Sequence, residues 1–111
     1  MTLTRDFKET IQARARHDAA FRKALLREGV ESFLAGDVET GKTVLRDYIN
    51  ATVGFEELAA AMHRSPKSVM RMFGPQGNPQ ARNLFDIMAY LQKKEGVRLE
   101  VRSARRRPEK R

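Results

Sequence analysis

One segment of the sequence has the spacing of a phosphate-binding loop. Residues 36–43, GDVETGKT, contain two glycines with four residues between them, followed by Lys and Thr. In nucleotide-binding proteins this loop follows a buried strand and opens a helix, so that backbone amides and the lysine hold phosphate. Here the preceding residues have helical periodicity, and Asp37 and Glu39 would place negative charge beside a phosphate. We therefore expect Asp37 to cap a helix and Lys42 to lie on its solvent face.

The other potentially reactive side chains lack the partner residues that catalysis requires. His17 and His63 are the two histidines, and neither has the spaced ligands of a metal site. The chain has no cysteine, which excludes disulfides, thiolate catalysis and sulfur-bound metal. The serines have no base and acid paired with them in the sequence. We therefore expect no enzyme activity, no cofactor and no metal.

Basic and polar side chains between residues 64 and 82 have the chemistry for binding DNA. Lys67 and Ser68, at the start of an expected helix, are the first candidates for base edges, and Arg71 lies one turn further on to contact guanine or phosphate. Arg64 and Ser65 are expected to bind the DNA backbone. The full set of candidate DNA-binding residues is Arg64, Ser65, Lys67, Ser68, Arg71, Asn78, Gln80 and Arg82.

Two short helices are expected to position these side chains. The first covers residues 55–62, with acidic residues at its start, where the helix dipole favours them. After a three-residue turn, Ser65 and Pro66 supply the N-cap and first-position proline of a second helix that runs through Phe73. Two short helices joined in this way are typical of a helix-turn-helix, which lays its second helix in the major groove.

Contacts between and beyond these two helices follow from their apolar residues. Ala59 is small enough to let the helices cross closely, and Leu58 with Val69 is expected to supply the contact between them. Met72 and Phe73 are expected to fasten the second helix to the last helix of the chain.

The remaining apolar periodicity predicts an all-α, compact bundle of about five helices. Beside the two short helices, it indicates helices over about 4–15, 19–35, 38–52 and 79–95. Their expected N-caps are Thr4, Asp18, Asp37 and Asn78, and Gly96 is expected to end the last helix. The expected inward residues are Phe21, Leu25, Leu26, Val30, Phe33, Leu34, Val44, Leu45, Tyr48, Ile49, Leu84, Ile87, Met88 and Leu91.

The chain divides by charge and pattern into three parts. Residues 1–52 are N-terminal helices for dimer or partner contacts, and residues 53–101 are the helix-turn-helix region of the same domain. Within the second part, residues 97–101, VRLEV, alternate like a short edge strand that could pair across a dimer interface. Residues 102–111 are a basic, disordered tail with six basic groups and one acidic group, in a chain of formal net charge +8. Such a tail either stays solvated or adds salt-dependent affinity for phosphate without reading sequence.

The sequence also bears on the compartment. No run approaches the roughly 18 to 20 apolar residues of a membrane-spanning helix. The start, MTLTRDFKET, lacks the apolar middle of a secretory signal. We expect a cytoplasmic protein without membrane contact.

The stretch FEELAAAMHRSPKSVMRMFGPQGNPQARNLFDIMAYL resembles the helix-turn-helix of Cro and lambda-repressor proteins. It resembles more closely the antidote proteins of bacterial toxin-antitoxin modules. The likeness covers about residues 36–101 and includes the upstream GDVETGKTVLRDYIN, the leucine-alanine helix, the serine-capped helix and the Gly77-Asn78-Pro79 step. It implies a homodimer that represses its own operon and binds a toxin protein.

The sequence departs from that family at two positions. Phe55 stands where repressors often have a DNA-contacting glutamine, and His63 stands where a glycine is usual in the turn. The first departure removes an amide that would contact DNA, and the second requires the turn to accommodate a bulkier side chain.

The expected function is therefore sequence-specific binding of double-stranded DNA by a dimeric autorepressor, with an antitoxin role as the extension that the resemblance implies. The alternative is a protein-interaction module in which helices within residues 4–52 neutralise a partner and the helix-turn-helix is scaffold. RNA binding is a third reading, although the chain lacks the aromatic-rich sheet that stacks single-stranded bases.

Overall fold

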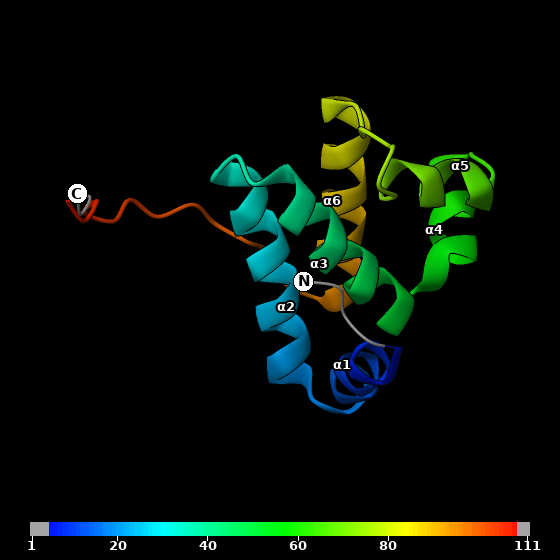
Figure 1. The fold of residues 1–111 in the computed structure, drawn as a ribbon, viewed down its shortest axis with the longest axis horizontal. Coiled ribbons are helices and arrows are strands. Elements are labelled where there is room, and N and C mark those ends of the chain that lie inside the picture. The colour runs from blue at the N-terminus through cyan, green and yellow to red at the C-terminus, as the bar shows by residue number, and fades with distance from the viewer. Residues whose placement is uncertain (1–4, 109–111) are drawn as a thin grey trace.

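The chain folds into a bundle of helices (Figure 1). The computed structural model describes the backbone of residues 5–108 and the side chains of residues 10–108. The described residues form six helices and no strand, which confirms the expected all-α fold, with one helix for each of the six expected helical segments. In chain order the helices are α1 (Arg5–His17), α2 (Ala19–Leu34), α3 (Val38–Ala51), α4 (Gly54–Met62), α5 (Pro66–Met72) and α6 (Ala81–Glu95).

Helices α2 and α3 form a tightly packed antiparallel hairpin, because each carries a glycine where the two helices meet. A Cβ atom on Gly29 would lie 2.7 Å from Cδ2 of Leu45. A Cβ atom on Gly41 would lie 2.7 Å from Cε2 of Phe33. Glycine lowers helix stability, but at these two positions it permits a closer approach of the helices than any other residue would allow.

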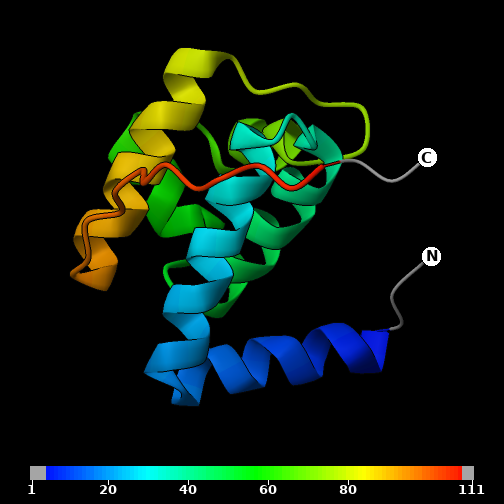
Figure 2. The same cartoon turned by 90° about the vertical axis from the view of Figure 1, so that its left-hand side faces the viewer.

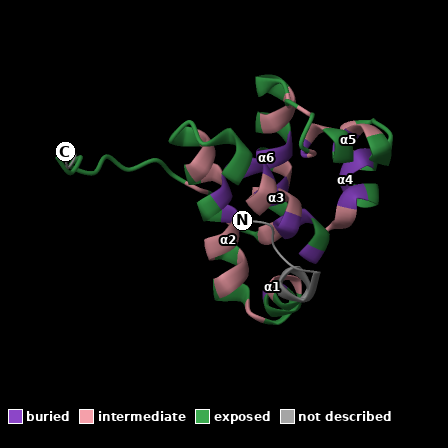
Figure 3. Cartoon of the chain, in the orientation of Figure 1, coloured by how far each residue is buried: buried purple, intermediate pink, exposed green. Residues whose placement is uncertain are grey.

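A single cluster of buried side chains joins α2 through α6, and buried segments face one another at the centre of the molecule (Figure 3). The cluster consists of Leu26, Leu45, Tyr48, Ile49, Phe55, Leu58, Ala59, Val69, Phe73, Ile87, Met88 and Leu91. Most of the expected inward stripe is therefore buried or packed against the core. Phe21 and Val44 are only half-buried, and Leu34, in the last turn of α2 at the tip of the hairpin, is 64% exposed.

The helix boundaries follow local signals at most ends. The side chains of Asp18 and Asp37 accept hydrogen bonds from the third residue after each, at 3.0 and 3.2 Å, so both expected caps are confirmed. Thr4 lies outside the described residues. Gly96 ends α6 in the left-handed conformation, as expected. The expected cap at Asn78 is wrong, because the chain stays extended through Gln80 before α6 begins.

Residues 97–101 do not form the expected strand. Val97 and Leu99 lie partly buried against the core, and the backbone N–H of Leu99 donates to Oε1 of Gln92 at 2.8 Å. A strand needs a neighbouring strand to pair with, and no other described segment is a strand. Residues 100–108 are exposed, and the chain leaves the body on the side opposite to α4 and α5 (Figure 1).

Candidate nucleic-acid interface

Helices α4 and α5 form a compact pair at one edge of the molecule, away from α2 (Figure 1). Leu58 and Ala59 of α4 and Val69 of α5 are all fully buried in the common core. Phe73, which follows α5, is also buried, with its ring 6.2 Å from that of Phe55. The core therefore fixes the orientation of both short helices, and the face of α5 opposite Val69 must point to solvent.

The turn between the helices depends on an unusual backbone conformation at His63. This residue has φ 56° and ψ 43°, the left-handed region, and its N–H bonds to the end of α4. Arg64 follows with its own N–H donating to the carbonyl of Ala59 at 3.0 Å. A glycine is favoured at such a position because it has no Cβ. The bulkier histidine is accommodated by keeping its side chain exposed.

Ser65 begins α5 as the sequence predicts. Its Oγ accepts a hydrogen bond from the backbone N–H of Ser68 at 3.1 Å, and Pro66 occupies the first turn of the helix. A hydroxyl group that accepts one hydrogen bond still has its own hydrogen to donate. The exposed Ser65 can therefore cap the helix and bind an anion at the same time.

The outer face of α5 presents cations to solvent. Lys67 and Arg71 are exposed and lie one turn apart, whereas Ser68 is half-buried. Met70, which is three residues from Lys67 and so next to it on the helix surface, is 53% exposed. Met70 was not among the expected DNA-binding residues, although its spacing of three from Lys67 places the two side chains next to each other on the helix surface. The outer face of α5 thus combines two hydrogen-bond donors with one flexible apolar group.

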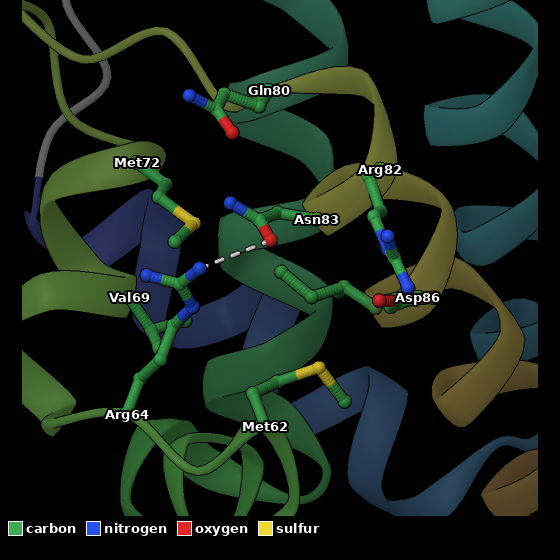
Figure 4. A pocket seen from close by; sticks show the side chains of 9 residues that line it. Met62, Arg64, Val69, Met72, Gln80, Arg82, Asn83 and Asp86 are labelled. Carbon is green, nitrogen blue, oxygen red and sulfur yellow. Dashed lines mark hydrogen bonds between the residues drawn. The ribbon is translucent and has the colours of Figure 1, made fainter.

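A second group of candidate residues lies around a cleft between the helix pair and α6. The cleft has a volume of about 330 Å³, and Arg64, Gln80 and Arg82 contribute to its lining (Figure 4). A guanidinium nitrogen of Arg64 donates to Oδ1 of Asn83 at 3.2 Å, which holds the arginine across the opening. Asn83 is a partner that the sequence analysis did not identify. The other lining residues are Met62, Val69, Met72, Asp86 and Ile87.

The candidate residues therefore form two groups rather than one. Lys67, Ser68 and Arg71 belong to α5, whereas Arg64, Gln80 and Arg82 surround the neighbouring cleft. Asn78 is exposed in the loop between α5 and α6 and is not among the residues that line the cleft.

Polar contacts also fasten α4 to α6. The hydroxyl of Tyr90 donates to Oε2 of Glu57 at 2.7 Å, and Nζ of Lys94 lies 3.3 Å from the same oxygen. The hydrogen bond from Tyr90, together with the Lys94 ammonium, holds the pKa of Glu57 below its usual value. The carboxylate form of Glu57 therefore bridges two residues of α6 at neutral pH.

Lys42 is buried, so the prediction that it lies on a solvent face is wrong. Its side chain is 2% exposed, and Nζ lies 3.1 Å from the carbonyl oxygen of Gly74 and 2.7 Å from that of Gly77. Lys42 precedes Leu45 by three residues and Ile49 by seven, which places it on the buried stripe of α3. The helical spacing could have revealed this burial, but the charge of the residue suggested exposure.

The same region does not have the structure of a phosphate-binding loop. Residues 36–43 follow helix α2 rather than a strand, and Asp37 is the N-cap of α3. Oε2 of Glu39 lies 3.1 Å from Nζ of Lys42. The ammonium group of Lys42 therefore forms an ion pair with this carboxylate and hydrogen bonds with the two glycine carbonyls.

The part of the chain that the structure describes contains neither a membrane-spanning helix nor a metal-binding cluster. No helix within residues 5–108 combines the length and the apolar character needed to cross a membrane. Among the described side chains, no three His, Asp or Glu gather in a way that could hold a metal ion.

Comparison of the chain with protein-family models, with curated proteins and with solved structures gives no match in any of the three.

Proposed function

We propose that this protein binds duplex DNA through α5 and regulates transcription. The observation that carries the proposal is the exposure of Lys67 and Arg71 on α5 while Val69, on the opposite face, is fully buried. A helix anchored in this way can enter the major groove, where Lys and Arg donate to the O6 and N7 atoms of guanine. Met70 can make an apolar contact with the methyl group of thymine.

The residues around the cleft have a different role in this proposal. Arg64, Gln80 and Arg82, which are all exposed, bind the DNA backbone on the α6 side of the recognition helix. Ser65 adds its hydroxyl hydrogen to the same backbone. Contacts to phosphate fix the register of the protein on DNA, and contacts from α5 read the bases.

The active form in this proposal is a homodimer that represses its own operon. Helix α5 has seven residues and reaches few base pairs, so a single copy offers little discrimination. Two copies related by a two-fold axis place their recognition helices in successive major grooves, about 34 Å apart. Such a dimer blocks the polymerase when its binding site overlaps the promoter.

A gel-shift experiment with the DNA upstream of the chain's own reading frame tests the proposal. The duplex is compared with a random duplex of equal length at two salt concentrations. We expect Lys67→Ala/Arg71→Ala to abolish the preference for the upstream duplex, because the lost donors read bases. Removal of residues 102–111 is expected to weaken both duplexes about equally, because the tail reads no sequence. If the double substitution and the truncation each weakened binding to both duplexes equally, the protein would bind DNA through charge alone, without reading its sequence.

A second function is favoured by the tip of the α2–α3 hairpin. Leu34 is 64% exposed and Val38 is 37% exposed, with the exposed carboxylates of Glu31, Asp37 and Glu39 nearby in the chain. An apolar pair among acidic groups suits a basic protein partner, such as the toxin that the antidote family implies. A neighbouring reading frame for a small basic ribonuclease-like protein would supply the candidate. Leu34→Ser/Val38→Ser should then weaken its binding and leave DNA binding unchanged.

A further inference from the structure

Two cations of α3 bind the backbone that follows α5. Nζ of Lys42 lies within hydrogen-bonding distance of the carbonyls of Gly74 and Gly77. One turn further along α3, Nη1 of Arg46 donates to the carbonyl of Phe73 at 3.2 Å. Both side chains therefore reach from the same face of α3 to one short stretch of backbone.

The carbonyls that these two cations bind belong to Phe73, the C-cap of α5, and to the loop that follows it. Carbonyl groups at the C-terminal end of a helix lack partners within the helix and carry partial negative charge. Within α5, Val69 is fully buried and Met72 packs partly buried against the core, so apolar contacts hold this helix along one face only. The ammonium of Lys42 and the guanidinium of Arg46 supply a second attachment at its C-terminal end.

The loop after α5 is folded back over that end. The N–H of Gly77 donates to the carbonyl of Gly74 at 3.1 Å. A Cβ atom at residue 77 would lie 1.8 Å from the carbonyl oxygen of Arg71, so the loop passes directly against the last turn of α5. Figure 2 shows this loop, in yellow-green, passing the N-terminal end of α3 before it reaches α6. Asn78 and Gln80 follow directly in the chain.

We propose that Lys42 is a positioning residue for DNA recognition: from inside the protein it fixes the end of α5 and the loop 74–80 in the orientation that meets DNA. The inference rests on the proposed function. Because the side chain is buried, donates to two glycine carbonyls and is paired with Glu39, Lys42 does not contact DNA itself in this proposal. The lysine of the phosphate-loop-like motif thus binds carbonyl groups of its own chain in place of a phosphate.

The variant Lys42→Met tests this role, because methionine keeps an unbranched side chain and removes the hydrogen-bond donors. Lys23→Met, at an exposed lysine of α2, is the matched control for the loss of one positive charge. Hydrogen exchange of the Gly77 amide reports on the loop without DNA. We expect at least about a tenfold faster exchange in Lys42→Met, with unchanged exchange in α2 and in the control, because opening of one segment need not involve the core.

DNA binding supplies a readout that distinguishes positioning from a direct contact. We expect Lys42→Met to lose about tenfold or more affinity for the upstream duplex and to keep its affinity for a random duplex within about twofold. The dependence of log K on log salt should stay as in the wild type. If Lys42 bound a phosphate, its replacement by methionine would instead lower the magnitude of that slope by about one.

Three outcomes would overturn the proposal. Wild-type exchange at Gly77 in Lys42→Met would show that the lysine does not hold the loop. Equal weakening on both duplexes with a lower salt slope would make it a phosphate contact. If neither Lys42→Met nor Lys42→Arg folded, Lys42 would be required for the fold as a whole and not for positioning the loop. If the wild type prefers no duplex, the proposed function fails, and the exchange measurement still decides whether Lys42 holds the loop.

Discussion

Tyr48 of α3 donates its hydroxyl hydrogen to the carboxylate of Glu95 at the end of α6. Nε of Arg22, on α2, lies 2.9 Å from both oxygens of the same carboxylate. The side chain of Glu95 is 4% exposed, so this hydrogen-bonded ion pair lies inside the protein and joins three helices. These three helices share one core with α4 and α5, so the stability of the cluster bears on the proposed recognition of DNA.

Tyr48 should make the fold sensitive to alkali. Burial, together with the hydrogen bond to Glu95 and its negative charge, raises the pKa of Tyr48 above the ordinary value. A raised pKa contributes stability that is fully present below the unfolded value, about 10, and is lost as pH rises through the folded value. We expect the free energy of unfolding in urea to fall between about pH 10 and 12. Tyr48→Phe should reduce this loss.

Ultraviolet absorbance of tyrosinate measures the same event directly. The chain has two tyrosines, and the hydrogen bond to Glu57 also raises the pKa of the second, Tyr90. Tyr90→Phe therefore leaves Tyr48 as the only signal. Ionisation of Tyr48 at an ordinary pKa in the folded protein would contradict the buried hydrogen bond.

Glu95→Gln should destabilise the protein strongly. The substitution leaves the guanidinium of Arg22, whose side chain is 25% exposed, without its carboxylate. Breaking a buried ion pair costs about 3 kcal/mol, somewhat less where one partner meets solvent. Urea denaturation measures the loss. Glu100→Gln is the matched control, because its 2.8 Å pair with Arg98 is largely exposed and worth about 0.5 kcal/mol or less. Equal effects of the two substitutions would contradict the assigned role of Glu95.

The sequence predicts those features of the fold that depend on local signals. The caps at Asp18, Asp37 and Ser65 and the left-handed end at Gly96 are confirmed, because each depends on neighbours within a few residues. The face of α5 that carries Lys67 also follows from local spacing.

Other positions depend on distant segments, and there the sequence misleads. Lys42 is buried because carbonyls more than thirty residues away provide its partners. Leu34 is exposed because the hairpin extends beyond its neighbours at that end. Asn78 does not cap α6 because the loop that contains it folds back over α5. Residues 97–101 carry a strand pattern, but a pattern cannot supply the second strand.

His63→Gly should stabilise the protein by about 1 kcal/mol, because glycine adopts the left-handed conformation without the steric cost of a Cβ. Thermal or urea denaturation measures the gain. Ala60→Gly is the control, because an exposed glycine inside α4 should cost about 1 kcal/mol. DNA affinity should not change with His63→Gly. A loss of affinity for the upstream duplex alone would show that the imidazole itself takes part in recognition.

Two glycines of one loop should differ strongly in how much stability their replacement by alanine costs. At Gly77 a Cβ atom would lie 1.8 Å from the backbone oxygen of Arg71, whereas at Gly74 the nearest atom would be 3.5 Å away. A backbone atom cannot rotate aside as a side chain does, so Gly77→Ala must displace the loop from the end of α5. We expect it to cost about 2 kcal/mol of stability.

Gly74→Ala, by contrast, should change stability by less than about 0.5 kcal/mol, as an ordinary surface substitution does. Displacement of the loop also separates the carbonyl of Gly77 from Nζ of Lys42, which lie 2.7 Å apart in the intact protein. Gly77→Ala should therefore reproduce the loss of preference for the upstream duplex that we expect of Lys42→Met, although it leaves every cation in place. If a folded Gly77→Ala protein kept its preference for the upstream duplex, the loop would have no role in DNA recognition.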